Sequence, residues 1–244
     1  MDESAKVALV TGAAKRVGRT VALTLAAAGY DVAITYLTSR GDADAVVHEI
    51  QKHGRRAIAI RADLQRPEEA IDQIHAAFTQ TFARLDVLVN NASNYKQMDL
   101  QQSRLPEMRQ LWAIHVESPL LLCQRFESML RAAKGHVVNM VDLLAERPWP
   151  QYLPYCASKA GLWNLTLGLA RALAPEVTVN GIAPGVVEWP PDYPAAEREK
   201  YLNRVPLARP GTPDDVASVV RFLVTDGAYI TGQILRLDGG RSIT

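Results

Sequence analysis

The chain has 244 residues, 48% of them hydrophobic, and its 27 basic and 26 acidic side chains leave a formal net charge of +1. This length suits one large α/β domain with a substantial core. The balanced charge argues against a nucleic-acid-binding surface, which normally needs a basic excess. No apolar run reaches about 18 residues, so we predict no membrane span. The acidic start at 1–4 carries no apolar signal segment, and we expect a cytoplasmic protein.

Short apolar strands alternate with amphipathic helices along the whole chain. Several strands are nearly continuous in Val, Ile, Leu and Ala, as expected of parallel strands that are buried on both faces. We predict strands at 7–10, 31–36, 57–61, 87–89, 136–140, 178–182 and 234–237, and helices at about 17–29, 41–53, 67–83, 104–132, 155–174 and 213–224. The predicted fold class is therefore α/β: residues 1–244 form a single doubly wound Rossmann domain, with a seven-stranded parallel sheet flanked by helices on both faces.

The glycine-containing turn after the first strand predicts a dinucleotide site. It reads Thr11-Gly12-Ala13-Ala14-Lys15-Arg16-Val17-Gly18 and opens the first helix. Small residues let the backbone approach a pyrophosphate, and the helix N-terminus supplies N–H donors and a favourable dipole. We expect Gly12, Arg16 and Val17 to contact the cofactor. The simpler alternative is an ordinary turn.

The end of the second strand indicates which dinucleotide binds. A site that prefers NAD normally places an acid here for the ribose hydroxyls, and none is present after Tyr36. Thr38, Ser39 and Arg40 instead offer hydroxyls and a guanidinium, which suit a 2′-phosphate. We therefore predict NADP(H), with a solvated Arg40 as the alternative.

Polar residues also follow the third and fourth strands. The carboxyl ends of strands are where open α/β sheets bind ligands, and the Asp63 carboxylate suits an adenine amino group. The further cofactor contacts predicted here are Leu64, Asn91, Ala92 and Ser93. Asn90 could instead tie neighbouring strands together, and both roles can hold at once.

A tyrosine and a lysine four residues apart predict the catalytic centre. Tyr155 and Lys159 lie on one face of the predicted helix 155–174. A nearby ammonium and the positive end of the helix dipole both favour tyrosinate, so we expect a lowered phenol pKa and proton exchange near neutral pH. Many helices carry a Tyr and a Lys at this spacing by chance. The catalytic interpretation therefore depends on the nucleotide-binding signature upstream.

Together these motifs resemble the short-chain dehydrogenase/reductase family over essentially the whole chain. The matching features are the turn at 11–18, Asp63, Asn90-Asn91-Ala92, Tyr155 to Lys159, Asn180-Gly181-Ile182-Ala183-Pro184-Gly185, and Ile230-Thr231-Gly232 with Leu237-Asp238-Gly239-Gly240. The resemblance implies that Lys159 also holds the cofactor ribose, that Pro184 and Gly185 contact the cofactor, and that the protein is a homotetramer.

Three departures make the chain similar to the pteridine reductases of that family. Arg16 replaces the middle glycine of the turn, Asp142 replaces the catalytic serine thirteen residues before Tyr155, and Asn-Asn-Ala ends in Ser93 with Tyr95 following. In this subgroup Tyr95 would stack a pterin, while Arg16 and Ser93 would bind it. Asp142 with Tyr155 would deliver a proton. The simpler alternatives are a capping Asp142, a loop aromatic at Tyr95 and a solvated Arg16.

Two further positions leave their roles open. His115 stands where the family usually has an asparagine that holds a relay water, and it either replaces that contact or is a buried histidine without a chemical role. The proline-rich segment at about 185–212, with a short helix predicted near 194–204, is expected to form a substrate lid. Within it Trp189 either lines the substrate pocket or pins the lid.

We therefore predict an NADPH-dependent reductase that transfers hydride to the C=N of a pteridine, dihydropteridine or dihydrofolate, with protons handled by Tyr155 and Asp142. No metal is expected. One alternative is a carbonyl reductase such as a 3-oxoacyl-carrier-protein reductase, which normally needs a serine hydroxyl in place of Asp142 to donate to the substrate carbonyl. The other is a non-catalytic NADP-binding sensor on the same fold.

Overall fold

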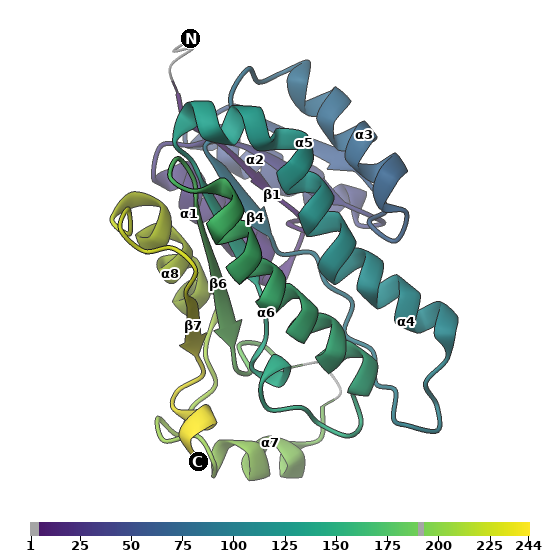
Figure 1. Cartoon of the computed structure of the whole chain (residues 1–244). Helices are drawn as coiled ribbons and strands as arrows, with labels where there is room; N and C mark the ends of the chain where they lie inside the picture. Colours follow the sequence, from purple (N-terminus) through teal and green to yellow (C-terminus); the bar gives the residue numbers. More distant parts are fainter. Residues whose placement is uncertain (1–4, 190–192) are drawn as a thin grey trace.

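The computed structural model describes residues 5–189 and 193–244 (Figure 1). The acidic start at 1–4 and residues 190–192 of the predicted lid lie outside these described residues. No helix in the described ranges combines the length and apolarity needed to cross a bilayer.

All seven predicted strands form one parallel sheet. Its order, β3-β2-β1-β4-β5-β6-β7, confirms the doubly wound fold. The strands are β1 (Val7–Val10), β2 (Asp31–Tyr36), β3 (Ala57–Arg61), β4 (Val87–Asn90), β5 (His136–Met140), β6 (Thr178–Pro184) and β7 (Ile234–Leu237). The strand order reverses between β1 and β4, and a crevice opens outside the carboxyl ends at such a switch point.

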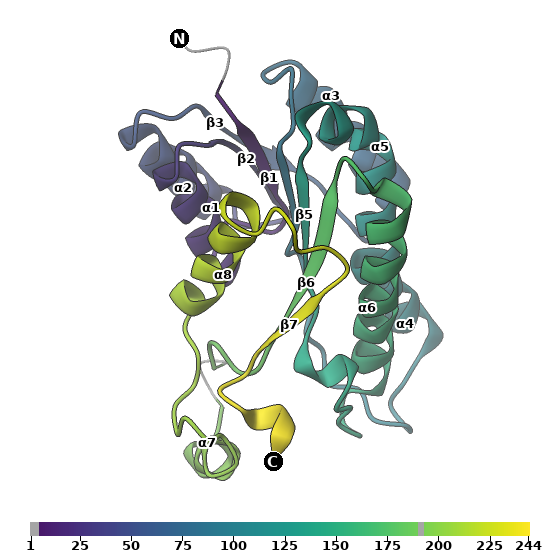
Figure 2. The ribbon, with the colours of Figure 1, turned by 60° about the vertical axis from the view of Figure 1, so that its left-hand side comes forward.

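Helices cover both faces of the sheet, as Figure 2 shows. One face carries α1 (Arg16–Ala27), α2 (Arg40–Lys52) and α8 (Pro213–Thr225), and the other carries α3 (Pro67–Thr79), α5 (Ser118–Ala133) and α6 (Leu153–Leu173). Each face buries its own apolar cluster, with Val21 and Val220 in the first and Phe78, Phe126 and Leu169 in the second. The rings of Phe78 and Phe126 pack edge to face with centroids 5.1 Å apart.

The prediction of one continuous helix over 104–132 is wrong. The chain forms α4 (Leu105–Trp112), then a π-helical turn over Ala113–Glu117, and then α5. Pro119 has no N–H to donate to the carbonyl of His115, so the regular α-helical ladder is interrupted at this point. The side chain of His115, in the wider turn, is buried.

The segment after β6 and the end of the chain lie together beyond the carboxyl ends of the strands. Figure 1 shows α7 (Ala195–Leu202), which confirms the short helix predicted in the lid, beside the last residues. A 3₁₀ turn, η3 (Arg241–Ile243), follows β7, and another, η2 (Leu143–Ala145), follows β5. Residues of α7, η2 and η3 line the crevice.

A buried carboxylate holds the start of β2. Asp31 accepts hydrogen bonds from the main chain and Nε of Arg56 and from Nε of Arg55, at 2.7–3.0 Å. Burial alone would raise the pKa of Asp31, but the bonds from Arg56 and Arg55 outweigh it and hold the pKa below its ordinary value. The ionised form is therefore the one that stabilises the fold.

We expect Asp31→Asn to lower the free energy of unfolding at pH 7 by about 1–3 kcal/mol, because two charge-assisted bonds are lost. A depressed folded-state pKa gives stability that is present above the unfolded value, about 3.9, and is lost as the pH falls through the folded value. The difference between variant and wild type should therefore shrink below about pH 4. Thermal melts across pH would measure it. Asp72→Asn, at an exposed pair with Arg125, is the control, and an equal loss there would contradict the role of Asp31.

Candidate functional site

Two adjoining cavities occupy the crevice. The first, the turn cavity, has a volume of about 540 Å³ and lies against the glycine turn. The second, the tyrosine cavity, has a volume of about 320 Å³ and contains Asp142, Tyr155 and Lys159. Four residues line both cavities: Arg16, Val17, Asn91 and Ser93. A ligand in the turn cavity can therefore reach the predicted catalytic residues.

At its two glycines, the turn packs too closely against the residues that follow β4 to carry a side chain. Gly12 has φ = 63°, and a Cβ there would lie 2.8 Å from Cα of Ala92. A Cβ at Gly18 would lie 2.5 Å from Nδ2 of Asn91 and 2.6 Å from the carbonyl oxygen of Gly12. The turn therefore presents bare backbone at a helix N-terminus, which fits the pyrophosphate of a dinucleotide.

Arg16 joins the turn to the lid. Its backbone has φ = 54°, a conformation that the family's usual glycine adopts without strain. Its Nε donates to the Glu188 carboxylate at 2.8 Å, and Nη2 donates to the Glu188 carbonyl at 3.1 Å. The guanidinium is thus paired with the lid at the boundary between the two cavities, and is not simply solvated.

The residues predicted to hold the cofactor's adenosine half are only partly brought together. Tyr36, Asp63, Leu64 and Ala92 line the turn cavity with Gly12. Thr38, Ser39 and Arg40 lie beyond its lining, and the exposed guanidinium of Arg40 is 3.7 Å from the Asp44 carboxylate. Pro184 and Gly185, also predicted as cofactor contacts, line the tyrosine cavity.

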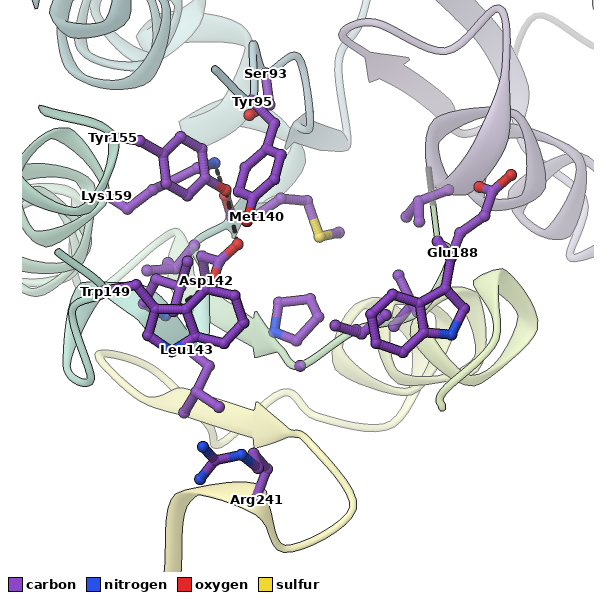
Figure 3. A pocket seen from close by; sticks show the side chains of 18 of the residues that line it. Ser93, Tyr95, Met140, Asp142, Leu143, Trp149, Tyr155, Lys159, Glu188 and Arg241 are labelled. Carbon is purple, nitrogen blue, oxygen red and sulfur yellow. Dashed lines mark hydrogen bonds between the residues drawn. The ribbon is translucent and has the colours of Figure 1, made fainter. Parts of the chain in front are cut away.

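The predicted catalytic centre contains a partly buried hydrogen bond between two side chains. The Tyr155 hydroxyl donates to Oδ2 of Asp142 at 2.7 Å, and the two groups face each other in Figure 3. The other oxygen of Asp142 accepts from the main-chain N–H of Leu144 at 2.8 Å, which caps η2. The capping alternative is therefore correct, and the same carboxylate also holds the tyrosine.

The expectation of a lowered tyrosine pKa is wrong for this structure. Burial and the adjacent Asp142 carboxylate raise the pKa of Tyr155 well above its ordinary value, and burial raises the pKa of Asp142. Burial also lowers the pKa of Lys159 to about 8. The lysine ammonium donates to the Met140 carbonyl at 2.7 Å and lies 5.8 Å from the centre of the Tyr155 ring. The Tyr155–Asp142 pair therefore holds its proton firmly.

Aromatic rings line the tyrosine cavity. Tyr95 stacks on Tyr152 with centroids 4.5 Å apart and meets Tyr155 edge to face at 4.9 Å. Trp189, from the lid, meets Tyr201 of α7 edge to face at 5.4 Å, and both line the cavity. Tyr95 and Trp189 therefore both line the cavity, and Trp189 also contacts α7.

His115 holds two serines. Its Nδ1 is 2.8 Å from Oγ of Ser158, and its Nε2 is 2.9 Å from Oγ of Ser93. Ser158 uses its one hydrogen to donate to the Tyr155 carbonyl at 2.7 Å, so Nδ1 must be the donor to Ser158. Nε2 then accepts from Ser93. Burial, reinforced by the charge of Lys159, lowers the pKa of His115 well below its ordinary value, which keeps the ring neutral.

This arrangement decides between the two readings of His115. Both ring nitrogens are occupied, so neither is left to hold a relay water. The imidazole instead orients the hydroxyl of Ser93, which lines both cavities.

The structure also settles the contacts of Asn90 and brings forward two residues that the motifs did not identify. Asn90 donates to Asn139 of β5 at 2.8 Å, and Asn139 donates to Thr166 of α6 at 2.9 Å, which confirms that Asn90 ties elements together. Arg147 and Arg241 line the tyrosine cavity, although no motif marks either one. No group of three or more potential metal ligands is found among the described residues.

We expect Gly18→Ala to raise the dissociation constant for NADPH at least about tenfold and to cost about 1–3 kcal/mol of stability, because the added methyl meets Asn91 and the turn backbone. Fluorescence titration with NADPH and chemical unfolding would measure both. Gly168→Ala is the matched control, since its Cβ meets nothing within 4 Å in α6. Unchanged NADPH affinity in Gly18→Ala would contradict the close approach proposed for the turn.

Comparison with known proteins extends over the whole domain. A family model described as enoyl-(acyl carrier protein) reductase matches residues 12–242. A 3-oxoacyl-[acyl-carrier-protein] reductase from Synechocystis sp. is 38% identical over 242 residues, covering 97% of each chain. One from Staphylococcus aureus is 38% identical over 240 residues, covering 96% of this chain and 97% of that protein.

Solved structures agree in fold. A blue fluorescent protein from a metagenomic library, in complex with NADPH, is 34% identical, covers 97% of each chain and superposes with a TM-score of 0.91. Acetoin dehydrogenase from Enterobacter cloacae is 31% identical, covers 98% of this chain and 96% of that one, and has a TM-score of 0.89. None of these four proteins is named a pteridine reductase.

Proposed function

Because the chain belongs to the short-chain dehydrogenase/reductase family of oxidoreductases, we propose that it is an NADPH-dependent reductase of the C=N bond of a pteridine, dihydropteridine or dihydrofolate. The observation that carries this proposal is the Tyr155–Asp142 hydrogen bond of 2.7 Å, at the position where the family normally has a serine. The family and the enzyme class are established by the comparisons, and the substrate is the proposal.

The residues around the turn cavity would hold the cofactor. Backbone at Gly12 and the start of α1 would take the pyrophosphate, and Asp63 would take the adenine amino group. When bound, NADPH supplies the hydride. Arg40 would have to exchange Asp44 for a 2′-phosphate, and both side chains are exposed enough to allow this exchange.

The buried pair would handle the proton. Reduction of a ring C=N needs a proton at nitrogen, and Tyr155 with Asp142 keeps one because the pKa of each group is raised. The ionised carboxylate is an acceptor only, so Asp142 also suits the amino edge of a pterin better than a carbonyl oxygen. The Tyr155 hydroxyl, positioned by Asp142, is the donor closest to the reaction.

The lining of the tyrosine cavity supports a flat, nitrogen-rich substrate. Tyr95, Trp149 and Trp189 give it aromatic walls, and Arg16 and Ser93 add a forked donor and a hydroxyl. The side of Tyr95 that faces Tyr152 is already covered, so the substrate would meet the remaining face.

Reduction of a 3-oxoacyl thioester is the second candidate. Two relatives that are 38% identical over nearly the full chain carry that name, which favours it over the pterin on similarity alone. Asp142 argues against it, because an ionised carboxylate cannot donate to a substrate carbonyl as a serine does. A non-catalytic NADP-binding sensor is the third candidate, disfavoured by the intact Tyr155 and Lys159.

We expect the wild type to oxidise NADPH with biopterin, dihydrobiopterin or dihydrofolate, and Asp142→Ser to lose about 10²–10³-fold in kcat/KM on that substrate, because the tyrosine loses its partner. Loss of NADPH absorbance would measure it, with acetoacetyl thioester as the competing substrate. Asp142→Asn is the matched variant, since it keeps the shape and one of the two acceptor oxygens while removing the charge of the carboxylate. Thioester turnover alone would move the protein to the second candidate. NADPH binding without turnover of any substrate would favour the sensor.

The NADP(H) preference has its own test. We expect Arg40→Ala to raise the dissociation constant for NADPH about tenfold or more and to leave that for NADH unchanged, because only the 2′-phosphate needs the guanidinium. Asp44→Asn, which frees Arg40 from its acidic neighbour, should bind NADPH at least as well as the wild type. Calorimetric titration would show both, and equal losses for NADPH and NADH would contradict the assignment.

A homotetramer is proposed from the family resemblance. Met108 and Trp112 of α4, Leu120 of α5 and Leu167 of α6 are exposed large apolar side chains on the helices that the family uses for assembly.

A further inference from the structure

Arginines that lack acidic partners gather at one side of the tyrosine cavity. Arg147 follows η2 and Arg241 begins η3, and both line the cavity. Figure 3 shows Arg241 across the view from Tyr155, beyond Leu143. Arg204, just after α7, joins Arg241 in lining an adjoining outer cavity of about 470 Å³. None of the ion pairs found in the described ranges involves any of these three arginines, whereas Arg16, Arg209 and Arg236 are all paired.

The guanidinium of Arg241 is held in place, but not all of its N–H donors have a hydrogen-bond partner. Its Nε is buried and has no hydrogen-bond partner in the described part of the chain, although a buried charged donor without a partner is costly. Its Nη1 makes only a long bond of 3.4 Å to the main-chain oxygen of Thr244, and its Cζ lies 5.7 Å from the Tyr201 ring centre.

Several hydrogen bonds hold the turn that carries Arg241. The Asp238 carboxylate accepts from the main-chain N–H groups of Gly240 and Ser242 at 3.0 and 2.7 Å, and Arg147 donates to the carbonyl of Ser242. The Asp238 carboxylate therefore makes its hydrogen bonds to the main chain of the turn and, within the described residues, forms no ion pair with Arg241. Burial and the neighbouring charges of Arg204 and Arg147 lower the pKa of Arg241, because both disfavour its charged form.

We propose that Arg241, assisted by Arg147, binds an anionic group, a carboxylate or a phosphate, on the part of the substrate that extends away from the reacting ring or carbonyl. Arg241 lines both the tyrosine cavity and the outer cavity, so a tail that leaves the reaction centre passes this residue. A guanidinium binds either anion through paired N–H donors. This subsite deepens the proposed function and relies on it only for the position of the reaction centre.

The test compares substrates that share a reacting group and differ in the tail. Dihydrofolate carries carboxylates and dihydrobiopterin carries none; acetoacetyl-coenzyme A carries phosphates and acetoacetyl-N-acetylcysteamine carries none. We expect Arg241→Met to lower kcat/KM for the anionic member of the pair that is turned over by about tenfold or more, and to leave the neutral member within about twofold. Arg241→Lys should retain part of the preference. Arg209→Ala, which removes an exposed charge paired with Asp215, is the control and should change neither member.

The outcomes separate the subsite from the proposed function. Turnover of thioesters alone would refute the pteridine substrate, while the thioester pair would still test Arg241. If neither pair is turned over, calorimetric binding of dihydrofolate and dihydrobiopterin to the NADP⁺ complex replaces kinetics. Equal losses on both members of a pair would show that Arg241 only supports the fold. Equal affinity of wild type and Arg241→Met for the anionic member would overturn the proposal as well.

Discussion

The hydrogen bond between Tyr155 and Asp142 is the interaction on which the site depends. It joins the start of α6 to the end of β5, and the same carboxylate caps η2, which leads to Arg147. Burial raises the pKa of both groups, so each keeps its proton to a higher pH than it would in solvent. Serine at this position would donate to a substrate; the carboxylate instead accepts from the tyrosine.

A second set of polar contacts lies behind the Tyr155–Asp142 pair and holds the elements that carry it. His115 lies in the π-helical turn that precedes Pro119. Its ring contacts Ser93 on one side and Ser158 on the other. Asn90, Asn139 and Thr166 link β4, β5 and α6 behind them. Each contact satisfies a group that would be costly to bury alone. The interior next to the site is therefore polar and largely paired; among the described residues, the buried side-chain atoms without a hydrogen-bond partner are Oδ1 of Asn90 and Nε of Arg241.

Two of the arginines that line the cavities differ in their pairing. Arg16 is held by Glu188 at the boundary between the two cavities, so it links the turn to the segment after β6. Arg241 lacks such a partner at the far side of the tyrosine cavity. A substrate would thus meet aromatic walls, a proton donor and a separate cationic region, and discrimination among substrates comes from which of these it can use.

The sequence by itself determined the sheet, the glycine turn and the position of Tyr155 and Lys159 on one face of a helix. Continuous apolar strands and amphipathic helices follow local periodicity, and Tyr155 with Lys159 follows helical spacing, so these features are encoded within a few residues. Only the tertiary structure decided how distant segments meet. The raised pKa of Tyr155, the two serine partners of His115, the pairing of Arg16 with Glu188 and the convergence of Arg147 with Arg241 depend on burial and on residues far apart in the chain. Pattern and spacing carry no information about such contacts, because desolvation and electrostatic coupling arise only once the chain has folded.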